Sequence, residues 1–195
     1  MAYNVGTNKQ DAYEQVKGLI DSFKEQYSFF RTAKYSEAQL RIDFLNPLLK
    51  SFGWDVDNES GKTQFLRDVI QEESIEVEEA DVITKKNPDY TLRILGNRKL
   101  FVEAKKVAID IETSKAASFQ TRRYGWNANL GISVLTNFEK LVVYDCRYKP
   151  DNKDDPQTAR YKVFHIENYL SKFDELYQLL SYEWVRFYFF PDFSP

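Results

Sequence analysis

The sequence contains very little of the residues on which several classes of site are built. Of its 195 residues, one is cysteine and one is histidine. With Cys146 alone, no disulfide can form within the chain and no zinc site of several cysteines can be built. His165 by itself supports neither a histidine-based nuclease nor a catalytic triad. The glycine-rich phosphate loop G-x-x-x-x-G-K is also missing, so we expect no nucleotide-driven motor in this chain.

Long apolar runs and an excess of basic residues are missing as well. Nowhere do about 18 uncharged apolar residues follow one another, and the N-terminus has no apolar segment after a basic start. We therefore expect neither a membrane span nor a secretion signal. The 27 Lys and Arg residues are outnumbered by 30 Asp and Glu, which gives a net charge of -3. A protein that holds DNA unaided usually shows a basic footprint, so any action on DNA would need a local basic patch or a neighbouring domain or subunit for targeting.

What is present is the composition of a folded domain. The chain is 43% hydrophobic and 29% charged, with the two signs interleaved. A chain of this length can bury one sizeable core but is too short for two ordinary domains and a linker. We therefore expect residues 1–195 to form a single domain.

Hydrophobic periodicity predicts two helices near the N-terminus. Residues 8–30 place apolar side chains at three- and four-residue spacing, which is typical of a helix with one apolar face. A second helix is expected to begin at Ser36, whose side chain can cap it with Gln39 as the capping-box partner. It should end at Gly53, and Pro47 should kink it.

The remaining pattern alternates between strands and helices. Residues 54–80 contain short apolar runs, which do not decide between strands and loops. Two clear strands then flank a turn at Gly96 and Asn97. Further elements are expected as strands over 131–136, 140–145 and 161–166, and as helices over 113–128 and 167–180. This order predicts an α/β fold in which a central mixed sheet, with the hairpin 89–105 at its heart, carries helices on both faces.

Three charged residues flank that hairpin. Asp89 follows Pro88 at the start of the first strand, and Glu103 and Lys105 lie at the end of the second. Residues i and i+2 of a strand point to the same face, so Glu103 and Lys105 should project together. If the strands pair about the turn, Asp89 comes opposite them. Two carboxylates and one ammonium group would then converge on one spot.

This trio suits the hydrolysis of a phosphodiester. Hard oxygen ligands hold Mg²⁺, which activates a bound water and stabilises negative charge, while a lysine can position that water. We expect Asp89 and Glu103 to bind Mg²⁺, or Mn²⁺ in its place, and Lys105 to act on the water. In the alternative, the aspartate merely begins a strand, and the glutamate and lysine are an ordinary pair on an edge strand. Against this, an apolar run such as LFVEAKK makes burial of the two charges costly unless they serve one another or a metal.

The same residues resemble a known motif. PDY at 88–90 followed by FVEAKK at 101–106 resembles the PD-(D/E)xK motif of the restriction-endonuclease-like superfamily. The segment YSEAQLRIDFLNPLLKSFGWD at 35–55 is similar to the helix that precedes this motif in the N-terminal nuclease domain of type I restriction HsdR subunits and of fused type IIG restriction-modification enzymes. QTRRY at 120–124 is similar to the Q-x-x-x-Y motif that follows it. The joint occurrence of these elements in the right order is far more specific than any one of them.

The resemblance covers about residues 35–180 and implies a restriction-endonuclease-like core there. Residues 1–34 would be an N-terminal helical extension and residues 181–195 a tail. In those families the chain continues into a linker and a methyltransferase or helicase. The last residues, SYEWVRFYFFPDFSP, depart from that pattern.

Further site residues are implied by the resemblance. Glu37 matches a glutamate that contributes to the metal site, and Gln120 and Tyr124 match residues near the active site or the DNA. Each has an ordinary alternative. An acidic residue in a first helical turn is favoured by the dipole and could pair with Arg41, and residues 120 and 124 could be a surface pair at i,i+4. Their neighbours Arg122 and Arg123 could contact phosphates or be solvated.

Together these features predict a Mg²⁺-dependent DNA endonuclease that serves as the cleavage module of a restriction-modification or related defence system. Its expected partners are double-stranded DNA, a methyltransferase, specificity or helicase domain or subunit, and a second copy for double-strand cleavage. The expected location is the prokaryotic cytoplasm. A second hypothesis is a catalytically silent module of the same fold for DNA binding or complex assembly. A third is an α/β interaction domain with an accidental motif, which would bind no divalent metal.

Overall fold

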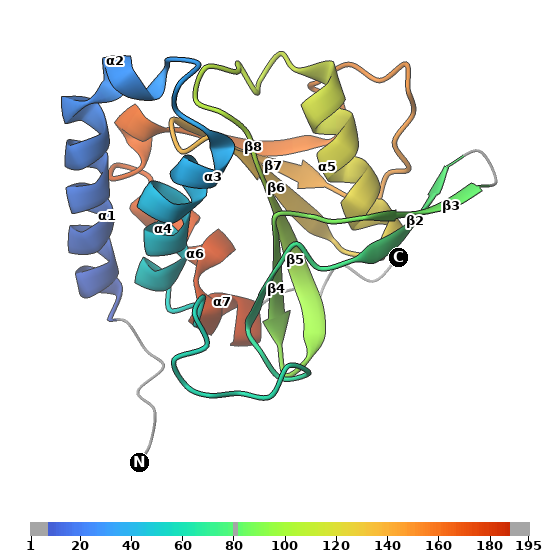
Figure 1. Ribbon diagram of the computed structural model, residues 1–195, viewed down its shortest axis with the longest axis horizontal. Helices are drawn as coiled ribbons and strands as arrows, with labels where there is room; N and C mark the ends of the chain where they lie inside the picture. Colours follow the sequence, from blue (N-terminus) through green and yellow to red (C-terminus); the bar gives the residue numbers. More distant parts are fainter. Residues whose placement is uncertain (1–7, 80–81, 188–195) are drawn as a thin grey trace.

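The computed structural model describes residues 8–79 and 82–187. A six-stranded mixed sheet runs through it, with helices on both faces (Figure 1), as the sequence predicts. The strand order is β1-β4-β5-β6-β7-β8, in which only β5 and β6 are parallel. These strands are β1 Val69–Gln71, β4 Tyr90–Ile94, β5 Asn97–Ala104, β6 Ile132–Thr136, β7 Lys140–Asp145 and β8 Arg160–His165. In the described residues no helix is both long and apolar enough to cross a membrane.

The first predicted helix forms as α1, Lys9–Glu25, and continues after a break as α2, Tyr27–Phe30. Of the side chains that its periodicity assigns to the apolar face, Val16, Ile20, Phe23 and Phe30 are buried, whereas Tyr13 and Tyr27 are partly buried. The ring of Phe23 lies 5.1 Å from that of Phe138, which follows β6. The N-terminal helix therefore packs into the same core as the sheet.

The second helix begins at Ser36 with the predicted capping box to Gln39. It runs as α3, Glu37–Leu40, a π-helical segment, Arg41–Leu45, and α4, Asn46–Ser51. The predicted irregularity at Pro47 is thus a widened turn, in which the Asn46 N–H donates to the Arg41 carbonyl. Proline cannot donate a backbone hydrogen bond, and its ring crowds the preceding turn. The helix ends before Gly53, whose φ is 85°.

The hairpin of β4 and β5 forms, with its turn one residue earlier than predicted. Ile94 pairs with Asn97, so the two turn residues are Leu95 and Gly96, with φ values of 48° and 83°. Tight two-residue hairpins favour positive φ at both positions because the twist of the turn then matches that of the strands. At the other end Tyr90 pairs with Val102. Asp89, which precedes β4, therefore lies opposite Glu103 of β5.

Residues 54–80, for which the sequence does not decide between strand and loop, contain β1 and the first strand of a separate hairpin. This hairpin consists of β2, Ile75–Glu79, and β3, Val82–Lys86, and projects from the body of the molecule beside α5 (Figure 1). Strand β3 is not predicted from the sequence, because its residues VITKK lack a repeating apolar face and none of them is buried.

Helix α5, Lys115–Asn127, confirms the helix predicted over 113–128. It covers the face of the sheet opposite to α1, α4, α6 and α7 (Figure 1). A Cβ atom on Gly125 would lie 2.4 Å from Cys146 Sγ and 2.5 Å from Ser133 Oγ. Glycine therefore allows this helix to approach the sheet closely, although it weakens helix propensity.

The C-terminal part corrects two expectations. The helix expected over 167–180 is shorter: α6 spans Phe173–Leu180 and is preceded by a 3-10 turn, Ile166–Asn168. A further helix, α7, Tyr182–Phe187, forms where no regular structure was predicted. Buried Tyr182 and Val185 fix it to the core, a tertiary contact that so short a segment does not reveal. The rest of the expected tail, and residues 1–7 of the expected extension, lie outside the described residues.

Candidate active site

The alternation of β5 divides its side chains between the two faces of the sheet. Val102 and Ala104 join the large core on the α4 side, whereas Phe101 packs in the smaller core that includes Tyr124 of α5. Glu103 shares the face of Phe101 and is 4% exposed. Because β5 lies between β4 and β6, the interpretation of an ordinary edge-strand pair is wrong. Glu103 therefore projects from an interior strand.

Lys105 follows the last residue of β5 and bonds directly to the glutamate. Its Nζ donates to Glu103 Oε1 at 2.7 Å, and its backbone N–H donates to the Thr136 carbonyl of β6 at 2.9 Å. Burial opposes protonation of the amine, but the adjacent Glu103 carboxylate raises the pKa of Lys105 above its ordinary value. The lysine is therefore charged at neutral pH.

Asp89 is fixed between the sheet and the α3 region. Its Oδ2 accepts a hydrogen bond from the Ala104 N–H at 2.7 Å, as the hairpin register predicts. Its Oδ1 accepts from Nη1 of Arg41 at 3.2 Å. Burial raises the pKa of Asp89, while these donors and Lys105 oppose the rise. The carboxylate therefore has a defined position next to Glu103.

The two oxygens of Glu103 differ sharply. Oε1 accepts from both Lys105 Nζ and Gln120 Nε2, each at 2.7 Å. Oε2 is buried and accepts no hydrogen bond from any side chain or backbone group in the described residues. Burial, the nearby Asp89 and Glu37 raise the pKa of Glu103 to about 7, against the effect of Lys105. A buried carboxylate oxygen without a donor is costly, and a cation is one group that would satisfy it.

Glu37 lies at the first position of α3 and belongs electrostatically to the same cluster. Burial raises its pKa, Asp89 raises it further, and Lys105 lowers it. The alternative pairing of Glu37 with Arg41 does not occur in the described residues. The guanidinium instead bonds to Glu72, Asp89 and Gln71.

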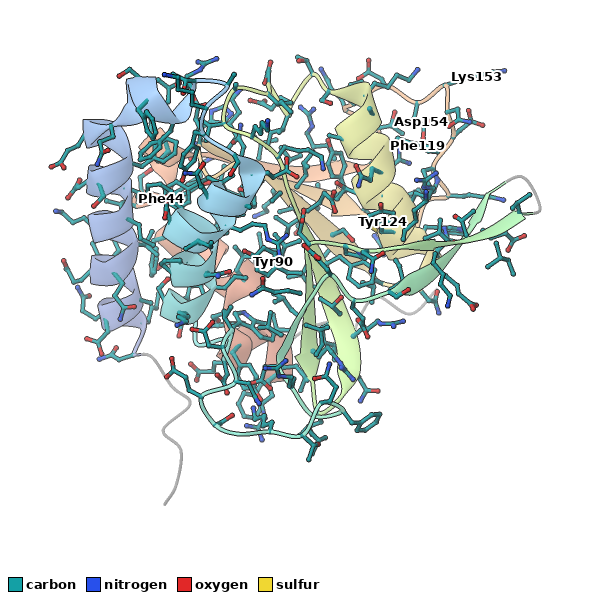
Figure 2. All side chains as sticks on the ribbon, viewed as in Figure 1. Phe44, Tyr90, Phe119, Tyr124, Lys153 and Asp154 are labelled. Atoms are coloured by element: carbon teal, nitrogen blue, oxygen red, sulfur yellow. The ribbon has the colours of Figure 1, made fainter. Side chains whose placement is uncertain are left out.

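Gln120 and Tyr124 of α5 are linked to Glu103 by hydrogen bonds. Gln120 Nε2 donates to Glu103 Oε1 and, at 3.0 Å, to the Tyr124 hydroxyl. Tyr124 is buried. Figure 2 labels Tyr124 on α5 and Tyr90 on β4. The alternative of a solvated surface pair is therefore wrong, and the two side chains form a chain of hydrogen bonds that orients Glu103.

The two arginines of α5 have different surroundings. Arg122 is only 1% exposed and pairs with Asp154 at 2.7 Å, which ties α5 to the loop that carries Asp154 (Figure 2). The expectation of an exposed side chain for phosphate contact is therefore wrong for this residue. Arg123 is partly exposed, and its Cζ lies 5.2 Å from the Phe119 ring and 5.9 Å from the Tyr124 ring.

Arg41 also belongs to this region, although the sequence motifs assign it no role in the site. Its Cζ lies 5.3 Å from the centre of the Tyr90 ring, and its guanidinium reaches Asp89. The one available signal was its position four residues after Glu37 on the predicted helix. His165, in contrast, lies at the end of β8 and contacts Glu112, outside this cluster.

The donors present fit a magnesium ion only with additional ligands. Within residues 8–79 and 82–187, no three His, Cys, Asp or Glu side chains form a ready group of metal ligands. Mg²⁺, however, keeps several waters and is commonly held by one or two carboxylates. Asp89 and Glu103 are a pair of this kind, and Glu103 Oε2 is an oxygen that accepts no hydrogen bond from the described residues. The chemistry of the donor set therefore fits Mg²⁺ or Mn²⁺.

Comparison with known proteins identifies a similar sequence but no family model and no solved structure. The chain is 41% identical over 178 residues to the type II restriction enzyme and methyltransferase RM.Eco57I of Escherichia coli. The match covers 91% of this chain and 17% of that protein. The chain therefore spans about a sixth of the length of this curated relative, and the matched part includes most of the domain described here.

Proposed function

We propose that this chain is a Mg²⁺-dependent DNA endonuclease domain with a restriction-endonuclease-like fold, the cleavage module of a restriction-modification system. The observation that carries the proposal is the convergence of Asp89 and Glu103 beside Lys105, with one buried glutamate oxygen bonded to no described residue. The similarity to a protein named as restriction enzyme and methyltransferase supports it.

The side chains divide the work according to their contacts. Asp89 and Glu103 would hold the metal, with Glu37 as a further acidic ligand. When bound, Mg²⁺ lowers the pKa of water and stabilises charge on a phosphate. Lys105 is held close by its bond to Glu103 and would position the attacking water and offset negative charge. Gln120, itself bonded to Tyr124, keeps the glutamate in its orientation.

Targeting of DNA is proposed to lie largely outside this chain. The net charge of -3 provides no general attraction to phosphates. The similar protein carries a methyltransferase activity in its name, and this chain matches only 17% of it. We therefore propose double-stranded DNA as substrate, a methyltransferase, specificity or helicase domain or subunit as partner, pairing of two copies for double-strand cleavage, and the cytoplasm of a prokaryote as location.

Plasmid cleavage tests the proposal directly. The protein is incubated with supercoiled plasmid in Mg²⁺, Mn²⁺ or EDTA, beside Asp89→Ala and the control Glu112→Ala, which removes a carboxylate outside the site. We expect nicked or linear DNA with either metal from the wild type and the control only. Metal binding without cleavage would favour the catalytically silent module. Absence of any divalent-metal binding would favour the interaction domain.

A further inference from the structure

We propose that Arg41 is a positioning residue that substitutes for a cation at Asp89 in the metal-free protein and thereby limits the affinity of the site for Mg²⁺. The inference rests on the proposed metal site. Arg41 Nη1 lies 3.2 Å from Asp89 Oδ1, one of the oxygens that would bind the metal. The guanidinium therefore contacts an oxygen that the ion would require.

Other bonds hold Arg41 in place independently of Asp89. Nη1 also donates to Glu72 Oε1 at 2.8 Å, and Nη2 donates to Gln71 Oε1 at 2.9 Å. The bond to Asp89 is the longest of the three. Gln71 ends β1, which is paired with β4, so this anchor belongs to the sheet. The arginine can therefore give up Asp89 to a metal ion while it keeps two of its three partners.

The backbone and the neighbouring ring restrict Arg41 further. Arg41 is the first residue of the π-helical segment, and its carbonyl accepts the wide-turn hydrogen bond from Asn46. Its guanidinium lies over Tyr90, whose hydroxyl donates to the Asn46 side chain at 2.7 Å. The arginine side chain is only 14% exposed. Held in this way, it remains a fixed positive charge beside the site after a metal has bound.

A fixed charge at this distance has two opposite effects. It orients Asp89 and favours its charged form when no metal is present, because a positive charge beside a carboxylate offsets part of the cost of burial. It also repels a divalent cation across a partly buried region, where two charges a few ångströms apart interact strongly. Arg41 would therefore make metal binding weaker and more dependent on the metal concentration than the carboxylates alone would.

Titration calorimetry with Mg²⁺ and no DNA tests this role. Arg41→Met removes the charge, and we expect its Kd for Mg²⁺ to fall about tenfold or more. Arg41→Lys keeps the charge and should stay within about threefold of the wild type. The matched control Arg98→Met removes an arginine that bonds Glu73 near the far end of β5, and it should leave the Kd unchanged.

The outcomes separate this inference from the proposed metal site. Unchanged or weaker Mg²⁺ binding by Arg41→Met overturns the role of Arg41, as does an equal effect of Met and Lys, which indicates a purely structural role. Arg41→Gln, a neutral side chain that keeps hydrogen-bond donors, replaces Met if melting shows that the Met variant does not fold. Wild-type Mg²⁺ affinity in Asp89→Asn would instead refute the metal site itself.

Discussion

Two clusters of this protein combine carboxylates with a lysine, and their difference shows what distinguishes a candidate site from ordinary surface charge. The first, here called the hairpin cluster, consists of Asp89, Glu103 and Lys105. The second, the Glu112 cluster, consists of Asp110, Glu112, Lys140 and His165. Both combine two acids with an amine, so residue types alone do not separate them.

In the Glu112 cluster each acid has a donor. Lys140 Nζ lies 2.9 Å from both Asp110 Oδ1 and Glu112 Oε1, and His165 Nε2 lies 2.9 Å from the same Glu112 oxygen. The bond from Lys140 lowers the pKa of Asp110. Burial opposes the shift at Glu112, but its bonds to Lys140 and His165 hold that pKa below its ordinary value as well. These bonds stabilise the ionised forms of Asp110 and Glu112 in the folded protein.

The hairpin cluster shows the opposite balance. Burial raises the pKa values of both Asp89 and Glu103, and one oxygen of the glutamate has no donor among the described residues. Acids whose pKa is raised by burial and by a like charge are typical of functional sites. The hairpin cluster is the candidate site because Glu103 is buried and one of its carboxylate oxygens accepts no hydrogen bond from the described residues. The number of charges does not distinguish the two clusters.

Loss of the amine gives the largest expected contrast. Lys105→Ala should reduce the rate of DNA cleavage by about 10² or more while DNA and metal binding remain nearly intact, because the lysine is proposed to act in the transition state. Lys140→Ala is the matched control and should leave the rate within about twofold. Cleavage rates are measured in Mg²⁺, and DNA binding in Ca²⁺. Unchanged cleavage by Lys105→Ala would remove the role assigned to it.

Metal-induced stabilisation gives the next contrast. A ligand that binds only the folded state at a hundredfold excess over Kd adds about 2.7 kcal/mol to the free energy of unfolding. For a domain of this size that raises Tm by about 5 to 10 °C. Asp89→Asn and Glu103→Gln should lose the shift with Mg²⁺ in a thermal melt, whereas Glu112→Gln should keep it. A full shift in both hairpin-cluster variants would place the metal elsewhere.

The pH dependence of stability should have opposite signs in the two clusters. The pKa of Glu103 rises from 4.5 to about 7 on folding, so between these values the folded state binds more protons than the unfolded state. The free energy of unfolding of the protein therefore decreases as pH rises through this range, by on the order of 1 to 3 kcal/mol. Glu103→Gln should remove this loss and raise metal-free stability at pH 8.

Glu112 provides the control for that measurement. Its pKa is lowered on folding, so it contributes stability above its unfolded pKa that is lost as pH falls through the folded value. Glu112→Gln should therefore reduce stability at neutral pH. Urea unfolding of both variants between pH 3 and 8 measures the two signs, because the window for Glu112 lies below its unfolded pKa of 4.5. The same sign for both variants would contradict the contrast between the clusters.

The smallest expected effect concerns DNA contact beside the hairpin cluster. Arg123→Ala should weaken DNA binding severalfold and reduce the slope of log affinity against log salt by about 1, as expected for one phosphate contact. Lys140→Ala should leave both unchanged. Binding is measured by fluorescence anisotropy over a range of salt concentrations. An unaltered salt slope in Arg123→Ala would leave that arginine with a packing role only.

Elements whose signals are local in the chain can be predicted from the sequence alone. The apolar periodicity of α1, the capping box at Ser36 and the alternation of the hairpin strands each depend on residues close together in the chain. The spacing of Asp89 from Glu103 and Lys105 across one tight turn is local in the same sense. This is why the trio was predicted correctly to converge, even though the turn is one residue earlier than expected.

Contacts between distant segments, in contrast, depend on how the whole chain folds. Arg41 bonds to Gln71 and Glu72 as well as to Asp89, and the buried Arg122 pairs with Asp154. No spacing in the chain predicts either set of contacts. The short helix α7 forms because its buried side chains reach a core assembled by other elements. Burial is a property of the whole fold, and burial raises the pKa of Glu103. The chain therefore specified which chemical groups meet at the hairpin, and the packing around them set their charge and their partners.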